Sequence, residues 1–421
     1  MIGPVMIGPS SSHTAASVRI GRLLRERAGG TPRHVHFRFD RHSSIAATYR
    51  AQAADLGLLA GLLGYETHSP EIVDAHALAG AAGLDYGFEV ADIGPGHPNT
   101  YYAEIDGVQY RALSTGGGMV ELYDCSGQAL PTDQVLPVRD QTIPSVPFTT
   151  AAEIADSELP LWELALQYES ARGSMAPGQV LAKMQEIVSL LERSLATNLP
   201  PDAAEGHLQR ILPNQAGLLE GKTLLGGEFS RKVLYYVTRF MDIKTSMGVF
   251  AAAPTAGSAG CLPGVVFALA QRRAEAFLAA GLVGVLIAHK STFAAEVCGC
   301  QAECGAGSGM AAAAAAQVLG CDTKTCLAAA SLALQNTFGM VCDPVANRVE
   351  VPCLGKNVMA AWNAIAAANM AASGFREVIG LDETIAAMDA VGRAIPRELR
   401  CTGEGGLSTT PTALALLRRT S

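Results

Sequence analysis

The pattern of apolar residues changes once along the chain, and that change limits the fold more than any other feature of the sequence. Up to residue 123, stretches in which every second residue is apolar alternate with stretches of helical spacing. Between Cys125 and Thr150 the pattern stops in a segment with four prolines, which is typical of a linker. Almost every later stretch has helical spacing. The sequence therefore predicts an α+β N-terminal domain, residues 1–140, followed by a larger all-α helical domain, residues 148–421.

Local signals place the individual elements. The first helix is expected to begin in the serine run at residues 10–12 and to end at Gly29, because hydroxyl side chains cap helix N-termini and glycine ends helices. Val35, Phe37 and Phe39 alternate with polar neighbours, as in a half-buried strand. Further strands are expected over 86–91, 101–105, 109–113 and 119–123, and further helices over 46–64, 157–174, 177–199, 229–241, 262–273, 275–288, 310–319, 325–335, 357–372 and 382–394.

Composition excludes several classes of partner. The chain of 421 residues has 31 basic and 39 acidic side chains, with no block of lysine or arginine, so neither a nucleic acid nor a membrane surface is expected as partner. The apolar run Phe277 to Ala288 is shorter than the roughly 20 residues that span a bilayer, and we expect a core helix there. No basic residue precedes the apolar start of the chain, which argues against a secretory signal and for a cytoplasmic protein. A small soluble substrate is the expected ligand.

The ten cysteines are distributed unevenly, since only Cys125 precedes residue 260. Ten are too few for a disulfide scaffold in a chain of this length, so we expect free, metal-bound or catalytic thiols. Five of them lie in glycine-rich or proline-rich segments: Cys298, Cys300, Cys304, Cys342 and Cys353. Because no histidine stands at zinc-finger spacing, an iron-sulfur cluster suits them better than zinc. Buried free thiols explain the same pattern.

Three polar motifs could bind a small molecule. The motif GPSSSHT, residues 8–14, lies at an expected helix N-terminus, where free N–H groups favour an anion such as a carboxylate. The motif GHPNT, residues 96–100, is a turn with side chains suited to hydrogen bonding, and PTAGSAGCLPG, residues 254–264, could present N–H groups to an anion. Each has a plain structural alternative, namely a helix cap, an Asx turn and an ordinary loop.

Together these motifs resemble one family, the bacterial iron-sulfur-dependent L-serine dehydratases, also called L-serine ammonia-lyases. IGPVMIGPSSSHTAASVRIG, HPNT and STGGG resemble the β part of that family. PTAGSAGCLPG, GCQAE, CDPVANRVEVPC and GGLSTTPT resemble its α part, in the same order along the chain. The resemblance covers essentially the whole chain and implies that β and α parts are fused.

The resemblance implies a 4Fe-4S cluster held by Cys300, Cys342 and Cys353, with Cys298 or Cys304 as alternatives to Cys300. The last two ligands are expected on non-helical backbone. Three ligands leave one iron open, and an open iron is a Lewis acid that can bind the hydroxyl of L-serine. With that hydroxyl activated as a leaving group and the Cα proton removed by a base, water is eliminated. The resulting aminoacrylate tautomerises and is hydrolysed to pyruvate and ammonia.

The resemblance also implies roles for polar residues of both parts. His13 is the first choice as base, because the ordinary pKa of histidine is close to neutral pH, and His97 is the alternative, with Ser12 beside them. The implied substrate-binding residues are Ser11, Thr14, Asn99, Thr100, Thr255, Gly257 and Ser258.

Other functions remain open from the sequence. The same chemistry could act on L-threonine or L-cysteine, and the thiols could instead hold the cluster of a redox or iron sensor without turnover. A sensor of this kind would not explain the polar motifs SSSHT and HPNT. The large alanine-rich helical domain leads us to expect a homodimer.

Overall fold

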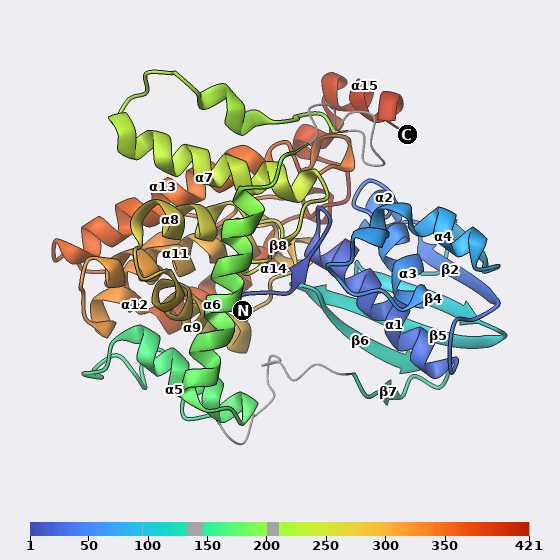
Figure 1. Ribbon diagram of the computed structural model, residues 1–421, viewed down its shortest axis with the longest axis horizontal. Coiled ribbons are helices and arrows are strands. Elements are labelled where there is room, and N and C mark those ends of the chain that lie inside the picture. The colour runs from blue at the N-terminus through green and yellow to red at the C-terminus, as the bar shows by residue number, and fades with distance from the viewer. Residues whose placement is uncertain (95, 133–145, 200–209, 421) are drawn as a thin grey trace.

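The structure is a computed structural model that describes residues 1–94, 96–132, 146–199 and 210–420. A region with a β-sheet and a larger helical region lie side by side (Figure 1), which confirms the expected fold class. The expected domain boundary, between 140 and 148, and much of the linker around it fall on residues 133–145, outside the described residues. The two domain limits therefore stay predictions.

The N-terminal region is built on a six-stranded sheet with the strand order β3-β2-β4-β5-β6-β7. Only β2 and β3 are parallel, and the other neighbours are antiparallel. The strands are β2 (His34–Asp40), β3 (Asp85–Ala91), β4 (Thr100–Ile105), β5 (Val108–Gly116), β6 (Met119–Asp124) and β7 (Ala129–Leu130). The helices are α1 (Ala16–Arg27), α2 (Ser44–Thr48), α3 (Ala54–Leu63) and α4 (Ala75–Ala81), with helical turns at Ser11–Ala15 and Pro70–Asp74. All five strands predicted from the sequence are present.

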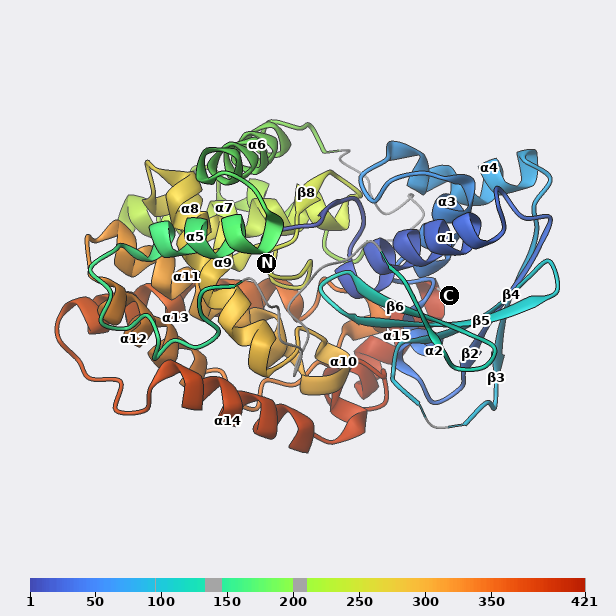
Figure 2. The same cartoon turned by 90° about the horizontal axis from the view of Figure 1, so that it is seen from below.

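Helices α1 and α3 pack closely beside the sheet, as the view from below shows (Figure 2). The contact depends on glycine, because a Cβ atom on Gly61 would overlap the carbonyl oxygen of Val18. The sheet presents Phe37 and Phe39 of β2 to the same core. The helix predicted over 46–64 is broken at Ala53, whose φ of 56° is left-handed. No glycine or proline marks that break in the sequence, so the spacing of apolar residues did not reveal it.

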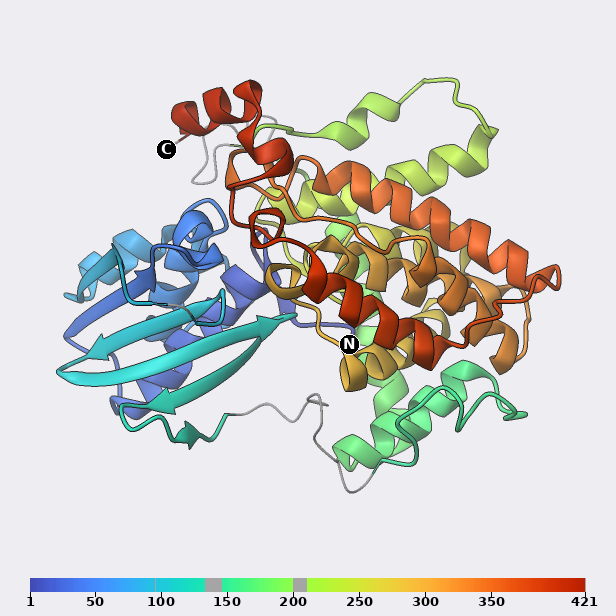
Figure 3. The same ribbon diagram turned by 180° about the vertical axis from the view of Figure 1, so that it is seen from behind.

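The helical region surrounds α9 (Arg273–Lys290) and α11 (Cys304–Val318), which contact each other (Figure 3). Residues 304–316 of α11 are all buried, and their alanine and glycine side chains allow neighbouring helices to approach closely. The other helices are α5 (Leu161–Gly173), α6 (Pro177–Leu195), α7 (Gly227–Thr245), α8 (Cys261–Leu269), α10 (Ala295–Cys298), α12 (Thr323–Gln335), α13 (Cys353–Ala372), α14 (Leu381–Ala394) and α15 (Pro411–Thr420). Short helical turns cover Gln215–Leu219, Cys300–Ala302, Val345–Asn347, Arg397–Leu399 and Gly406–Thr409.

The first residues of the chain join the two regions. Strand β1 (Val5–Met6) pairs antiparallel with β8 (Phe250–Ala251), so that the chain starts in the helical region before it enters the sheet region (Figure 1). Each of these strands leads into one of the polar motifs, residues 8–14 and 254–264. The pairing therefore brings the two motifs together across the junction. Two-residue strands have no periodicity, so the sequence could not predict this contact.

The apolar run Phe277 to Ala288 lies within α9 and is buried in the helical core, as predicted, although Gly281 is only half-buried. Among the described residues, no helix combines the length and the apolar character that crossing a membrane requires.

Candidate active site

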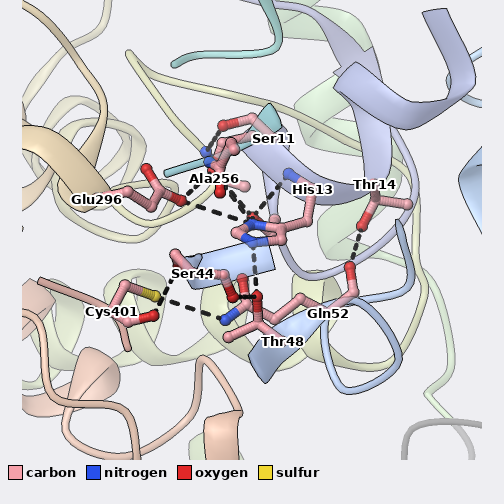
Figure 4. A network of polar contacts seen from close by, with 12 residues as sticks. Ser11, His13, Thr14, Ser44, Thr48, Gln52, Ala256, Glu296 and Cys401 are labelled. Atoms are coloured by element: carbon pink, nitrogen blue, oxygen red, sulfur yellow. Dashed lines mark hydrogen bonds and ion pairs between the residues drawn. The ribbon is translucent and has the colours of Figure 1, made fainter. Parts of the chain in front are cut away.

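The site begins at the turn of π-helix that precedes α1, residues Ser11–Ala15. Ser10 caps this turn, since its hydroxyl oxygen accepts a hydrogen bond from the backbone N–H of His13 at 3.2 Å. Ser11 is tied to the helical region, because its hydroxyl oxygen accepts from the backbone N–H of Ala256 at 3.1 Å (Figure 4). The hydroxyl of Thr14 donates to the backbone oxygen of Gln52 at 2.9 Å. These contacts hold His13 rigidly at the junction.

The imidazole of His13 is completely buried. Its Nε2 lies 2.8 Å from Oγ1 of Thr48, and that hydroxyl donates its own proton to the backbone oxygen of Ser44 at 2.7 Å. Thr48 therefore accepts from Nε2, which assigns the proton of the neutral ring to Nε2. The lone pair is then on Nδ1, 3.0 Å from the hydroxyl of Ser10. Nδ1 is the basic atom of the site.

Glu296, on α10, is the acidic partner of His13. Its Oε1 accepts from the hydroxyl of Ser12 at 2.9 Å and lies 3.7 Å from Nδ1 of His13 (Figure 4). Burial lowers the pKa of His13, and the negative charge of Glu296 opposes this effect. A neutral imidazole next to a carboxylate can accept a proton and be stabilised afterwards. Sequence reasoning missed Glu296, although it stands four residues before Cys300 in the motif that was read for its cysteines.

His97 and its neighbours approach from the sheet region. Nδ1 of His97 accepts from the backbone N–H of Asn99 at 3.2 Å, and the hydroxyl of Thr100 donates to the backbone oxygen of His97 at 2.7 Å. Burial lowers the pKa of His97 as well. The amide group of Asn99 is fully buried, and neither of its polar atoms has a hydrogen-bond partner among the described residues. Asn99 therefore does not form the Asx turn that was the structural alternative, and its amide is available to a ligand.

The loop of residues 254–258 packs on the same junction. The hydroxyl of Ser258 donates to the backbone oxygen of Ala253 at 3.0 Å and lies 3.2 Å from the hydroxyl of Thr255. Gly257 faces Glu303, and a Cβ atom at this position would overlap the carboxylate. Burial, more than any other cause, raises the pKa of Glu303 to about 8. The two hydroxyls predicted to bind substrate thus mainly hold the loop in shape, in a form that leaves room for Glu303.

Buried thiols lie next to this loop. Cys300, Cys342 and Cys401 form one cluster of buried side chains. Cys401 was not among the cysteines predicted to lie at the site. The backbone N–H of Cys401 donates to the oxygen of Cys342 at 2.7 Å, so the two thiols are brought together by main-chain pairing. Hydrogen bonds from the thiols of Cys304 and Cys342 hold the pKa of Cys300 well below its usual value.

Cys353 corrects one expectation, because it is the first residue of α13 and not part of a non-helical segment. Only Cys342 lies on irregular backbone, in an isolated bridge to Arg400. The proline before Cys353 starts the helix there, as prolines do at helix N-termini. Two lysines lie close by. Lys244 is fully buried within electrostatic range of Cys353, and Lys356, which is partly buried, donates to Asp343 at 2.9 Å within range of Cys300.

The donor set fits an iron-sulfur cluster by its chemistry. The thiols come from separate segments, are buried, and are accompanied by Lys356, a cation that offsets the charge of thiolates. No group of three or more His, Cys, Asp or Glu side chains in the described ranges is placed to hold a single metal ion. A four-iron cluster binds each cysteine to a different iron, so its ligands need not meet at one point. The thiol of Cys298 lies 3.8 Å from Asp389 instead, whereas Cys304 is close to Cys300.

The site therefore combines a buried imidazole and its carboxylate partner with a set of thiols at the junction of the two regions. Comparison with known proteins identifies the class of protein. The family model "Serine dehydratase alpha chain" matches residues 156–408. The chain therefore belongs to the serine dehydratase family.

Individual relatives agree with this assignment in both regions. The probable L-serine dehydratase alpha chain of Bacillus subtilis is 40% identical over 212 residues, which cover 49% of this chain and 70% of the relative. The probable beta chain of the same organism is 40% identical over 131 residues, 30% of this chain and 59% of the relative, and corresponds to the N-terminal part. The L-serine dehydratase of Streptomyces coelicolor is 27% identical over 446 residues, 96% of each chain. Fused β and α parts are thus confirmed.

Proposed function

We propose that this protein is an L-serine dehydratase that converts L-serine to pyruvate and ammonia. The observation that carries the proposal is the basic Nδ1 of His13, which is held between Ser10 and Glu296 next to the buried thiols. Family membership supports the reaction class, and the full-length relative from Streptomyces coelicolor bears this name.

In the proposed mechanism His13 removes the Cα proton of the substrate at Nδ1. The imidazolium that forms lies 3.7 Å from Oε1 of Glu296, so a negative charge stabilises it where no solvent can. Thr48 holds the ring by accepting from Nε2 and prevents rotation during the transfer. We assign His13 as the base in preference to His97, because a carboxylate oxygen of Glu296 lies 3.7 Å from Nδ1 of His13 and can stabilise the imidazolium.

Cys300, Cys342 and Cys353 would hold a 4Fe-4S cluster, and Cys304 is the alternative to Cys300. When bound, the cluster supplies a Lewis acid that polarises the hydroxyl of the substrate as leaving group. The chain's own contribution is the burial of the thiols and the cationic side chain of Lys356, whose pKa is raised by the negative charge of Cys300 and by its bond to Asp343 although burial opposes this.

The remaining predicted residues complete the proposal. Ser12 orients Glu296 toward His13, and Asn99 presents an unpartnered amide to the ligand. The other residues that we propose at the substrate site are Ser11, Thr14, Thr100, Thr255, Gly257 and Ser258. We also propose a cytoplasmic homodimer. A sensor without turnover would have no use for a neutral buried base, so that alternative is less well supported than turnover of L-serine, L-threonine or L-cysteine.

The test uses protein purified without oxygen. Iron and sulfide are measured together with the visible spectrum, and pyruvate release is followed from L-serine, L-threonine and L-cysteine on the same sample. Iron near four per chain with pyruvate from L-serine supports the proposal. A cluster without turnover of L-serine would favour another substrate or a sensor, and no iron even after anaerobic reconstitution would contradict the mechanism.

A further inference from the structure

A cavity of about 440 Å³ opens between the two regions and contains the edge of the site. Its walls include His97 and Tyr102 from the sheet region, and Glu296, Arg393, Arg397 and Arg400 from the helical region. Glu296 therefore contacts His13 on one side and this cavity on the other. His13 itself does not line the cavity, so Glu296 is the residue that connects the cavity with the buried base.

Two charged side chains in the cavity wall each have an unused buried atom. Glu296 is only 3% exposed, and its Oε2 has no hydrogen-bond partner in the part of the chain that the structure describes. Arg400 donates from Nη1 to the backbone oxygen of Val297 at 2.9 Å, whereas its Nε is buried without a partner within the same described ranges. A buried polar atom without a hydrogen bond is costly, so both groups favour a further partner, and their charges favour one of opposite sign.

The other two arginines of the cavity differ, because acidic neighbours already satisfy them. Nε of Arg393 donates to Asp389 at 2.8 Å, and Arg397 pairs with Glu404. Glu296 and Arg400 do not satisfy each other, since no ion pair within 4.0 Å joins them among the described residues. The cavity wall thus includes one carboxylate and one guanidinium group, each with one buried atom that has no partner among the described residues.

We propose that Glu296 and Arg400 together recognise the zwitterionic head of an α-amino acid, with Glu296 binding the ammonium group and Arg400 the carboxylate. The inference rests on the proposed function, because it identifies the residues that recognise the substrate of that site. Guanidinium groups bind carboxylates through paired hydrogen bonds of matching geometry, and a carboxylate is the natural acceptor for an ammonium group.

The position of both residues explains how the head group would orient the rest of the substrate. Glu296 holds the ammonium group on the side of Nδ1 of His13, the atom that takes the Cα proton. Arg400 is paired with Cys342 through its backbone and precedes Cys401, so the carboxylate is bound beside the thiol cluster. The amino acid side chain, attached to the same Cα, is then confined between the base and the thiols.

The experiment crosses variants with ligands that lack one charge each. Equilibrium binding to anaerobically purified protein is measured for L-serine, for L-glycerate, in which a hydroxyl replaces the ammonium group, and for L-serinamide, which lacks the carboxylate charge. The variants are Glu296→Gln, Arg400→Gln and, as matched control from the same cavity, Arg393→Gln. Iron content and thermal unfolding of each variant show whether the fold and any cluster are intact.

We expect Arg400→Gln to weaken the binding of L-serine and L-glycerate about tenfold or more, and to change the affinity for L-serinamide by less than about twofold. Glu296→Gln should weaken the binding of L-serine and L-serinamide by a similar factor, and should change the affinity for L-glycerate by less than about twofold. Arg393→Gln should change none of them by more than twofold. If each variant weakens all three ligands equally, or if Arg400→Gln leaves L-serine binding unchanged, the inference is wrong.

This binding experiment and the test of the proposed function can fail independently of each other. Wild-type protein that binds L-serine with the crossed pattern but releases no pyruvate keeps the inference and contradicts the dehydratase. Wild-type protein that releases pyruvate without the crossed pattern keeps the dehydratase and overturns the inference. Absence of binding by any of the three ligands to intact wild-type protein also overturns it. Where Glu296→Gln fails to fold, Glu296→Asp serves in its place, with weakening of the two ammonium ligands alone as the supporting result.

Discussion

The two regions of the molecule contribute different chemistry to one site. The sheet region supplies a histidine and a network of hydroxyl groups, all held by hydrogen bonds of 2.7 to 3.3 Å (Figure 4). The helical region supplies soft thiols packed among alanine side chains, and the carboxylate of Glu296. Directional hydrogen bonds fix the geometry of a proton acceptor, whereas close packing excludes water around thiolates. Neither region has both groups that an elimination reaction needs.

The largest effect is expected from the thiols of the helical region. Cys342→Ser should remove iron and lower kcat about a thousandfold or more, because loss of a Lewis acid forfeits several kcal/mol of transition-state stabilisation. Iron analysis and pyruvate assays measure both. Cys326→Ala, at a buried thiol of α12 outside the cluster of Cys300, Cys342 and Cys401, is the control and should keep iron and activity. Equal iron loss in both variants would show that general unfolding is responsible.

A smaller but still large effect is expected from the sheet region. His13→Gln should lower kcat about 10²-fold to 10⁴-fold, the usual contribution of a positioned base, while the iron content stays at the wild-type value. His34→Gln, at an exposed histidine of β2, is the control. The two regions are then separated by their readouts, since one variant loses the cofactor and the other only turnover. Full activity of His13→Gln would transfer the role of base to His97.

The pH profile tests how Glu296 links the two regions. The base must be neutral, and burial lowers the pKa of His13, so kcat/KM should fall only as the pH drops through a value below 6.5. In Glu296→Gln that acidic limb should move to still lower pH, because the charge that raises the pKa is gone. The plateau should also fall, since the imidazolium loses its partner. An unchanged limb would mean that His13 does not titrate in the profile.

The same shift predicts the pH dependence of stability. The unfolded chain binds a proton at His13 more tightly than the folded chain, so this group favours folding above pH 6.5 and loses part of that contribution as the pH falls below it. Chemical denaturation at pH 7.5 and pH 5.5 measures the loss. His13→Gln should show a smaller difference between the two pH values than the wild type does. An equal difference would assign the effect to other groups.

The smallest effect concerns packing within the sheet region. Gly61→Ala should lower the free energy of unfolding by about 1–3 kcal/mol, because the added methyl group overlaps the backbone of α1. Gly80→Ala, on α4 with no atom near the new Cβ, should instead stabilise by about 0.5–1 kcal/mol. Urea denaturation of both variants is the measurement. Similar destabilisation by both would contradict the close approach of α1 and α3.

The sequence predicted elements better than it predicted contacts. The alternation of Val35, Phe37 and Phe39 identified β2, because a half-buried strand imposes a period of two residues. The break at Ala53 in the helix predicted over 46–64 was not predicted, because it arises from a left-handed backbone conformation that no glycine or proline indicates. Cys353 was expected on irregular backbone although it begins α13, because the prolines of its segment indicated a turn and Pro352 in fact stands at the N-cap of that helix.

The site shows the same division. Motifs in the sequence singled out His13, Asn99, Cys300 and Cys342, whose roles stay predictions. Glu296, Arg400 and Cys401 were missed, because a sequence does not show which groups surround a single charged or thiol residue in space. By itself the sequence determined the fold class, the two kinds of region and the family, since periodicity and motifs are local properties. Only the tertiary structure decided which nitrogen of His13 is basic and which buried polar atoms lack partners, because both depend on contacts between separate segments, such as those of His13 with Thr48 and with Glu296.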